Sequence, residues 1–117
     1  MAAQMEISHR EDEHGVIVIT LAGRIMIGEE SAQIESLVEE LLAGGKKSIV
    51  FDLSGVKHMD STGIGRFIAC LNRVMAANGK MRMAAATKVV REGFRVTRLD
   101  TVFEFVDDLD SACQSLS

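Results

Sequence analysis

Strand-like and helix-like hydrophobic patterns alternate along this chain, and their order restricts the possible folds more than any other feature. The first two patterns are both strand-like. Apolar and polar residues alternate over residues 5–10, and β-branched residues dominate residues 16–22. A polar turn at residues 11–15 joins them, so the pair predicts an antiparallel hairpin. Every later strand pattern is separated from the next by a helix pattern, which is typical of parallel strands joined by helices.

The middle of the chain predicts two helices around a buried strand. The first helix follows Ser31, a possible N-cap, and ends at the pair Gly44-Gly45. Residues 48–53 predict a strand covered on both faces, because their central residues are consecutively apolar. The second helix follows Ser61 and stops at Asn78-Gly79. Both helices have apolar residues at helical spacing: Ile34, Leu37, Val38, Leu41 and Leu42 in the first, and Ile64, Phe67, Ile68, Leu71, Val74 and Met75 in the second.

The last third of the chain continues the alternation. Residues 81–86 predict a strand, Thr87 can cap a helix that buries Val90 and Phe94, and residues 102–106 predict a short strand. A final helix over residues 109–116 places Cys113 in the core. The order β-β-α-β-α-β-α-β-α in 117 residues predicts one α/β domain over residues 1–117. Its central mixed β-sheet is opened by the N-terminal hairpin and flanked by about four helices.

The net charge of −4 conceals an uneven distribution along the chain. Residues 1–56 carry −6, residues 57–98 carry +7 and residues 99–117 carry −5. A basic segment on two helices is ordinarily a solvated face. The alternative is a positive surface that binds nucleic acid, built from Arg66, Arg73, Lys88, Arg91, Arg95 and Arg98. The chain has no Trp and no Tyr on which bases would stack, so we expect no direct nucleic-acid partner.

Several classes of chemistry lack their sequence signals. Neither a G-x-G-x-x-G fingerprint nor a phosphate-binding loop ending in Gly-Lys-Ser/Thr is present. His9 and His14 flank an acidic turn that is better explained as solvated than as a metal site. His58 precedes Ser61, but Met59 stands where a nucleophile elbow needs its first glycine. We therefore expect no enzyme activity, no catalytic residue, no metal and no cofactor.

The cysteines and the hydropathy bear on location. Cys70 and Cys113 have no spacing typical of a disulfide framework or a zinc site, so we expect both to be reduced and buried. No apolar run approaches the ~20 residues that cross a membrane. The polar, acidic start does not resemble a signal peptide, so we expect a cytoplasmic protein without membrane insertion.

Residues 51–65 are the most informative stretch for function. They run from the buried strand through a short loop into the first turn of the second helix, with Ser61 at or beside the N-cap. Gly63 and Gly65 leave that turn without bulky side chains, so a partner backbone or a phosphate can approach the hydroxyl. Asp60 either orients or deprotonates Ser61, or is simply an acid beside a helix N-terminus. The structural alternative for the whole stretch is ordinary capping.

These residues resemble a known family. The run Asp60-Ser61-Thr62-Gly63-Ile64-Gly65, after the strand over residues 49–53, resembles the signature of the STAS domain in its branch of bacterial anti-sigma-factor antagonists. The run Leu21-Ala22-Gly23-Arg24-Ile25 is similar to the second strand of that family and its following turn. Residues 99–103 are similar to its last strand. The resemblance covers nearly the whole chain and implies a STAS-like fold.

The resemblance also implies partner switching, a form of transcription regulation. In that family the serine that matches Ser61 is phosphorylated by an anti-sigma factor. The anti-sigma factor is itself a GHKL-type serine kinase and supplies the ATP. A metal-dependent serine phosphatase removes the phosphate. The unmodified antagonist binds the kinase and frees a sigma factor. Whether Thr62 also accepts phosphate stays open.

One residue in the expected partner-binding region differs from the family pattern. Many members carry an acidic residue shortly after the glycine at Gly23, in a loop that meets the kinase, whereas this chain has Met26. Either the partner differs, or Glu29 and Glu30 supply the negative charge from a shifted position. The expected partner-binding residues are Gly23, Arg24, Met26, Glu29, Glu30 and Arg66. The alternative within the family is a STAS sensor or scaffold subunit that binds a partner or small ligand without phosphorylation.

Overall fold

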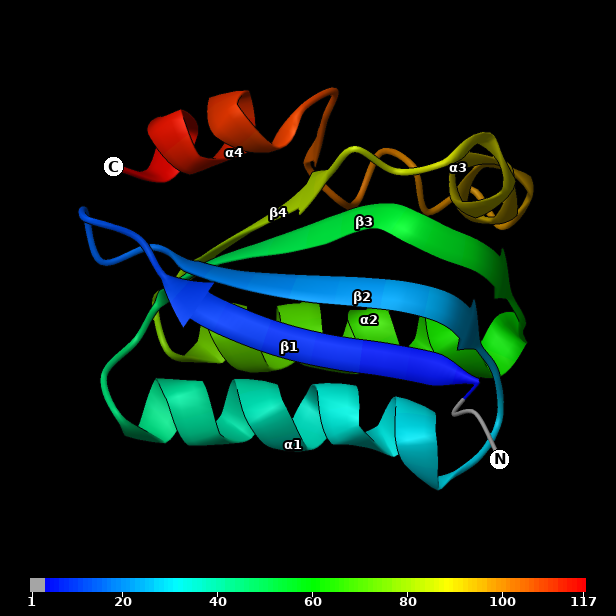
Figure 1. Cartoon of the computed structure of the whole chain (residues 1–117), viewed down its shortest axis with the longest axis horizontal. Coiled ribbons are helices and arrows are strands. Elements are labelled where there is room, and N and C mark those ends of the chain that lie inside the picture. Colours follow the sequence, from blue (N-terminus) through cyan, green and yellow to red (C-terminus); the bar gives the residue numbers. More distant parts are fainter. Residues whose placement is uncertain (1–3) are drawn as a thin grey trace.

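A five-stranded mixed sheet forms the centre of the computed structural model, which describes residues 4–117. Across the sheet the strands are β1 (Met5–Glu11), β2 (Ile17–Ile25), β3 (Ser48–Met59), β4 (Lys80–Ala84) and β5 (Phe105–Val106). β1 pairs antiparallel with β2, and all other neighbours pair in parallel. The predicted mixed sheet with its N-terminal hairpin is therefore confirmed (Figure 1).

Four helices flank this sheet. They are α1 (Glu29–Ala43), α2 (Ser61–Ala76), α3 (Lys88–Val96) and α4 (Leu109–Leu116). Right-handed crossovers that step in one direction across a parallel sheet place their helices on the same face. Accordingly, the buried residues of α1, α2 and α3 share one core, whereas Ala112 of α4 packs with Val16, Val50 and Ala84. Figure 1 shows α1 and α2 on one side of the sheet and α4 on the other.

All five phenylalanines of the chain form one connected cluster. The rings of Phe51 in β3 and Phe67 in α2 meet edge to face, with centroids 5.1 Å apart. Phe94 in α3 then joins Phe67 to Phe103 and Phe105. Aromatic edge-to-face pairs add about 0.5–1.5 kcal/mol each beyond the area they bury. The few aromatic residues thus anchor α2 and α3 to the sheet.

β3 is longer than the sequence indicated. The predicted strand ended at residue 53 and was followed by a loop, but β3 continues to Met59. After a register shift its second half pairs with the end of β2, where Gly23 lies opposite Val56 and Ile25 opposite Met59. This extension was invisible in the local pattern because polar residues interrupt it. Only Asp60 separates the strand from α2.

Other boundaries also needed correction. Ser31 does not cap α1, which begins at Glu29 after the N-cap Gly28; the Ser31 side chain is buried and donates to the Gly28 carbonyl at 3.1 Å. The strand expected from residue 102 is reduced to Phe105–Val106, because residues 99–103 turn back on the Leu99 carbonyl. Val102 is exposed. Thr87 caps α3, as predicted.

The cysteines are both free, but their burial differs from the prediction. Cys70 of α2 is fully buried, and burial raises the pKa of its thiol to about 12. Cys113 of α4 packs against the smaller core cluster yet stays partly exposed. The α4 stripe therefore buries Ala112 rather than Cys113 at its centre.

Candidate functional site

Ser61 is an exposed residue at the start of α2. It is the first helical residue, its neighbour Asp60 is the N-cap, and its side chain is exposed. Thr62 is half-buried. β3 carries the chain directly to this point, so Ser61 stands where the end of a central strand meets the start of a helix. Its hydroxyl is therefore accessible to another molecule.

Both carboxylate oxygens of Asp60 accept hydrogen bonds from the backbone. Oδ1 accepts from the N–H of Gly63 at 2.9 Å, and Oδ2 accepts from the N–H of Ile27 at 2.9 Å. Burial would raise the pKa of this carboxyl, but the N–H groups outweigh it and hold the pKa below its ordinary value. A strongly ionised carboxylate with both oxygens engaged is a poor proton acceptor. The geometry favours the capping role over deprotonation of Ser61.

The two glycines after Ser61 differ in what the fold requires of them. A Cβ at Gly63 would lie 2.6 Å from Met59 Cγ and 2.7 Å from the Ile25 carbonyl, so close packing on the strand ends demands glycine there. A Cβ at Gly65 would have nothing within 4 Å. Glycine inside a helix costs about 1 kcal/mol relative to alanine. The fold alone therefore gives no reason for Gly65, which keeps the surface beside Ser61 flat.

The loop between β2 and α1 lies beside this helix start, because Asp60 binds its Ile27 N–H. A cleft of about 240 Å³ opens along the loop. It brings together four of the expected partner-binding residues, and is lined by Gln4, Arg24, Met26, Ile27, Gly28, Glu29, Glu30 and Ser31. Sequence reasoning missed Ile27, a residue that is 77% exposed. The sequence feature that could have indicated Ile27 is an apolar residue immediately before a glycine in a loop.

Two of the expected partner-binding residues have structural roles. Gly23 adopts φ +90° in β2, and a Cβ there would lie 2.2 Å from the Gln4 carbonyl. The carboxylate of Glu30 accepts from the backbone N–H groups of Gln4 and Met5, at 3.3 and 3.5 Å. Glu29, in contrast, is exposed in the first turn of α1. Of the two acids proposed to replace the missing charge at Met26, Glu29 is the more available.

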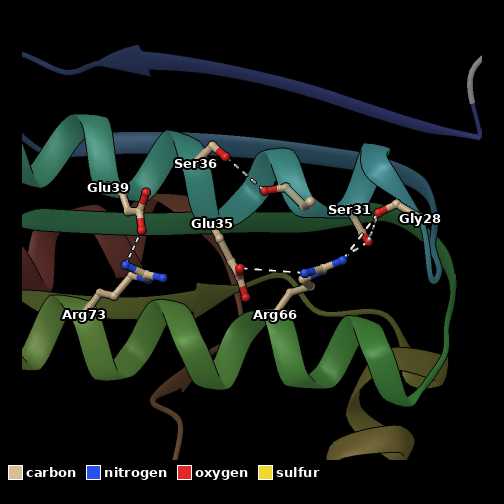
Figure 2. Close-up of polar contacts among 8 residues, drawn as sticks. Gly28, Ser31, Glu35, Ser36, Glu39, Arg66 and Arg73 are labelled. Carbon is tan, nitrogen blue, oxygen red and sulfur yellow. Dashed lines mark hydrogen bonds and ion pairs between the residues drawn. The ribbon is translucent and has the colours of Figure 1, made fainter.

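Four arginines of the basic segment form ion pairs, and do not make the free positive face that the nucleic-acid alternative requires. Arg66 and Arg73 of α2 point towards α1 and pair with Glu35 and Glu39, as Figure 2 shows. Arg91 pairs with Asp107, and Arg95 with Glu92. Two of these pairs join α2 to α1, one lies within α3, and one joins α3 to the residue before the N-cap of α4. This pairing weakens the nucleic-acid alternative.

The histidines lie away from any convergent site. His58 is exposed on β3, and His14 makes an exposed ion-pair contact with Glu13 at 3.7 Å. Within residues 4–117, no three His, Cys, Asp or Glu side chains gather closely enough to hold a metal ion. None of the helices in that range has the length and apolar character needed to span a membrane.

The chain is a small α/β domain with an exposed serine at the start of α2, and it is similar to proteins of one known family. The sequence profile of the STAS domain matches residues 8–112, so the chain belongs to the STAS domain family. It is similar to the anti-sigma-F factor antagonist RsfB of Mycobacterium tuberculosis, with 27% identity over 101 residues, which cover 86% of this chain and 81% of that protein.

Two solved structures are similar in fold. An anti-sigma factor antagonist from Mycobacterium paratuberculosis superposes with a TM-score of 0.81 at 22% identity, over 96% of this chain and 93% of that one. The Bacillus cell fate determinant SpoIIAA in its phosphorylated form has a TM-score of 0.73 at 17% identity, over 96% of this chain and 100% of that one. The predicted STAS fold is thereby confirmed.

Proposed function

We propose that this chain is an anti-sigma-factor antagonist that acts by partner switching, with Ser61 as its phosphoacceptor. The unmodified chain binds an anti-sigma factor of the GHKL-type serine kinase class and releases a sigma factor. That kinase supplies ATP and phosphorylates Ser61, which ends binding, and a metal-dependent serine phosphatase restores the unmodified form. The protein itself is a regulator without enzyme activity, located in the cytoplasm.

The observation that carries this proposal is the placement of Ser61. Its side chain is exposed at the first position of α2, beside the cleft-lining loop that Asp60 holds in place. Gly65, which the fold does not require, leaves room next to it. The names of the relatives support the same reading, since one is an anti-sigma-F factor antagonist and another was solved in a phosphorylated form.

Electrostatics is consistent with a switch that acts on binding and not on folding. A phosphoserine adds about −1.5 to −2 charges at pH 7, and the positive end of a helix dipole favours negative charge. Because the Ser61 side chain is exposed, its phosphate would also stay hydrated in the free domain. In a docked complex the same charge is desolvated or repelled, and that loss of complementarity lowers affinity.

The experiment that tests this proposal follows phosphate transfer directly. The full chain is incubated with a candidate GHKL-type anti-sigma kinase and Mg-ATP, and intact mass is recorded over time. We expect one added phosphate group, which Ser61→Ala abolishes and Thr62→Ala does not. Absence of phosphate with a kinase that binds the chain contradicts the proposal and favours a STAS scaffold that works without phosphorylation. Phosphate retained in Ser61→Ala contradicts the assignment of Ser61 and means that another residue is the acceptor.

A further inference from the structure

Arg66 is the only basic side chain of α2 that reaches the start of α1. Its guanidinium donates to Ser31 Oγ at 3.3 Å through Nε and to the Gly28 carbonyl at 3.4 Å through NH2. The remaining nitrogen lies 3.7 Å from Glu35 Oε2. Figure 2 shows the guanidinium between Ser31 and Gly28 at the start of α1 on one side and Glu35, further along α1, on the other. Only 23% of the Arg66 side chain is exposed, so the guanidinium belongs to the helix interface more than to the surface.

The Gly28 carbonyl accepts hydrogen bonds from both Ser31 and Arg66. Gly28 is the N-cap of α1, has φ 141°, and as a glycine supplies no side-chain capping bond to the first turn. Ser31 is the one fully buried polar side chain among the described residues. The backbone conformation at Gly28 is therefore maintained by groups that α1 and α2 bring to it.

The adjacent residue is held by α2 as well. The Ile27 N–H donates to Asp60, the N-cap of α2, while the Gly28 carbonyl accepts from Arg66, six positions further along the chain. Two consecutive loop residues are thus fixed to one helix through two separate side chains. Between these attachments the Ile27 side chain projects into solvent.

We propose that Arg66 is a positioning residue: it holds the loop over residues 26–28 against α2 so that Ile27 is presented as an apolar contact beside Ser61. An apolar side chain on a loop that is already ordered binds without the entropy cost of ordering that loop. The partner that fits carries an apolar surface opposite Ile27, in place of the basic group that an acidic residue at position 26 would require. This consequence for partner choice rests on the proposed function, whereas the holding of the loop does not.

Arg73 provides a matched control within the same interface. It pairs with Glu39, about two helical turns along α2 from Arg66, and makes no contact with the loop. Its side chain is 44% exposed, against 23% for Arg66. Removing Arg73 therefore deletes an ion pair between the same two helices and leaves both attachments of the loop in place.

The first measurement uses the isolated chain and needs no partner. Amide hydrogen exchange at Ile27 reports opening of the loop, because that N–H is bonded only to Asp60. We expect Arg66→Ala to reduce its protection about tenfold, while Arg73→Ala changes it less than about twofold and core amides of β3 stay protected in both. Equal protection in Arg66→Ala and the unaltered chain, or an equal loss in Arg73→Ala, overturns the inference.

Two further variants separate the contacts of Arg66. Lysine at this position retains a charge for Glu35, but one ammonium cannot reach Ser31 and Gly28 in the fork geometry of a guanidinium. We expect Arg66→Lys to reduce the protection of Ile27 about as much as Arg66→Ala does, and Glu35→Gln to leave that protection unchanged. Full protection in Arg66→Lys would assign the effect to the Glu35 pair and refute the role of the Gly28 contact.

The second measurement is the affinity for an anti-sigma kinase. We expect Ile27→Ala and Arg66→Ala each to weaken binding about tenfold, and the double variant to bind about as weakly as Ile27→Ala alone. Additive losses would mean that Arg66 acts independently of Ile27, which overturns the positioning role. If the unaltered chain binds no such kinase, the proposed function fails, and the exchange experiment alone decides whether Arg66 holds the loop.

Discussion

The Asp60 carboxylate accepts a 2.9 Å hydrogen bond from the backbone N–H of Ile27, a residue 33 positions earlier in the chain. The same carboxylate caps α2 through Gly63. One side chain therefore links the start of the helix that bears Ser61 to the loop that carries the most exposed large hydrophobic residue of the described chain. This link places the exposed Ile27 side chain near Ser61, the proposed phosphoacceptor.

Removal of the Asp60 side chain tests whether it is more than a cap. We expect Asp60→Ala to lower the free energy of unfolding by about 2 kcal/mol, since the cap and the loop attachment are both lost. Asp108→Ala is the control, because Asp108 caps α4 through Ser111 and reaches no distant segment. That loss should be about 1 kcal/mol in urea unfolding. Equal losses would show that the bond to Ile27 adds nothing to stability.

Acid should weaken the fold partly through Asp60. Its pKa is lower in the folded protein than the ordinary value of 3.8, so folding favours the ionised carboxylate. That stability is fully present above the unfolded pKa and is lost as pH falls through the folded pKa. Urea unfolding between about pH 5 and pH 2 should show a shallower decline for Asp60→Asn than for the unaltered chain. Parallel declines in the free energy of unfolding would show that Asp60 does not contribute to the acid sensitivity of the fold.

The paired glycines of α2 predict opposite effects on stability. Alanine at Gly63 would clash with Met59 and the Ile25 carbonyl, so Gly63→Ala should destabilise the domain by about 1–3 kcal/mol. Alanine at Gly65 meets nothing, so Gly65→Ala should stabilise it by up to about 1 kcal/mol. Gly65→Ala should nevertheless weaken kinase binding if the partner docks over this surface. A variant with both improved stability and unchanged affinity would remove that surface from the interface.

A charge at Ser61 should affect binding and not folding. Ser61→Asp places a negative group at the exposed start of α2, where the helix dipole favours it, so the melting temperature should stay close to that of the unaltered chain. Kinase affinity, measured by calorimetry, should fall sharply. Ser61→Asn is similar in shape but uncharged, and it should bind better than Ser61→Asp. Equal affinities for these two variants would refute the electrostatic switch.

The two thiols should differ in reactivity. Burial raises the pKa of Cys70 to about 12 and removes its thiol from solvent, whereas Cys113, whose pKa burial also raises, is partly exposed. A thiol reagent at pH 8 should modify Cys113 slowly and Cys70 only when the protein unfolds. Mass spectrometry of the folded chain checks this. Early modification of Cys70 would show that α2 separates readily from the core.

Local patterns were sufficient for most secondary-structure elements. The spacing of apolar residues predicted all four helices, and the cap at Thr87 and the stop at Asn78-Gly79 lay where the sequence placed them. These features depend on neighbours within one or two turns. The second half of β3 was missed because its residues become a strand only by pairing with β2, a long-range contact that leaves no periodic signal.

The candidate site divides in the same way. The sequence by itself determined that a serine followed by small residues begins a helix after a central strand, because capping and glycine placement are local. Only the tertiary structure decided that Asp60 binds Ile27, that Arg66 turns towards Gly28 and away from solvent, and that Gly63 is required where Gly65 is not. The physical reason is that these roles depend on which distant backbone groups lie within hydrogen-bond or van der Waals reach, and the packing of α1 and α2 on the sheet sets those distances.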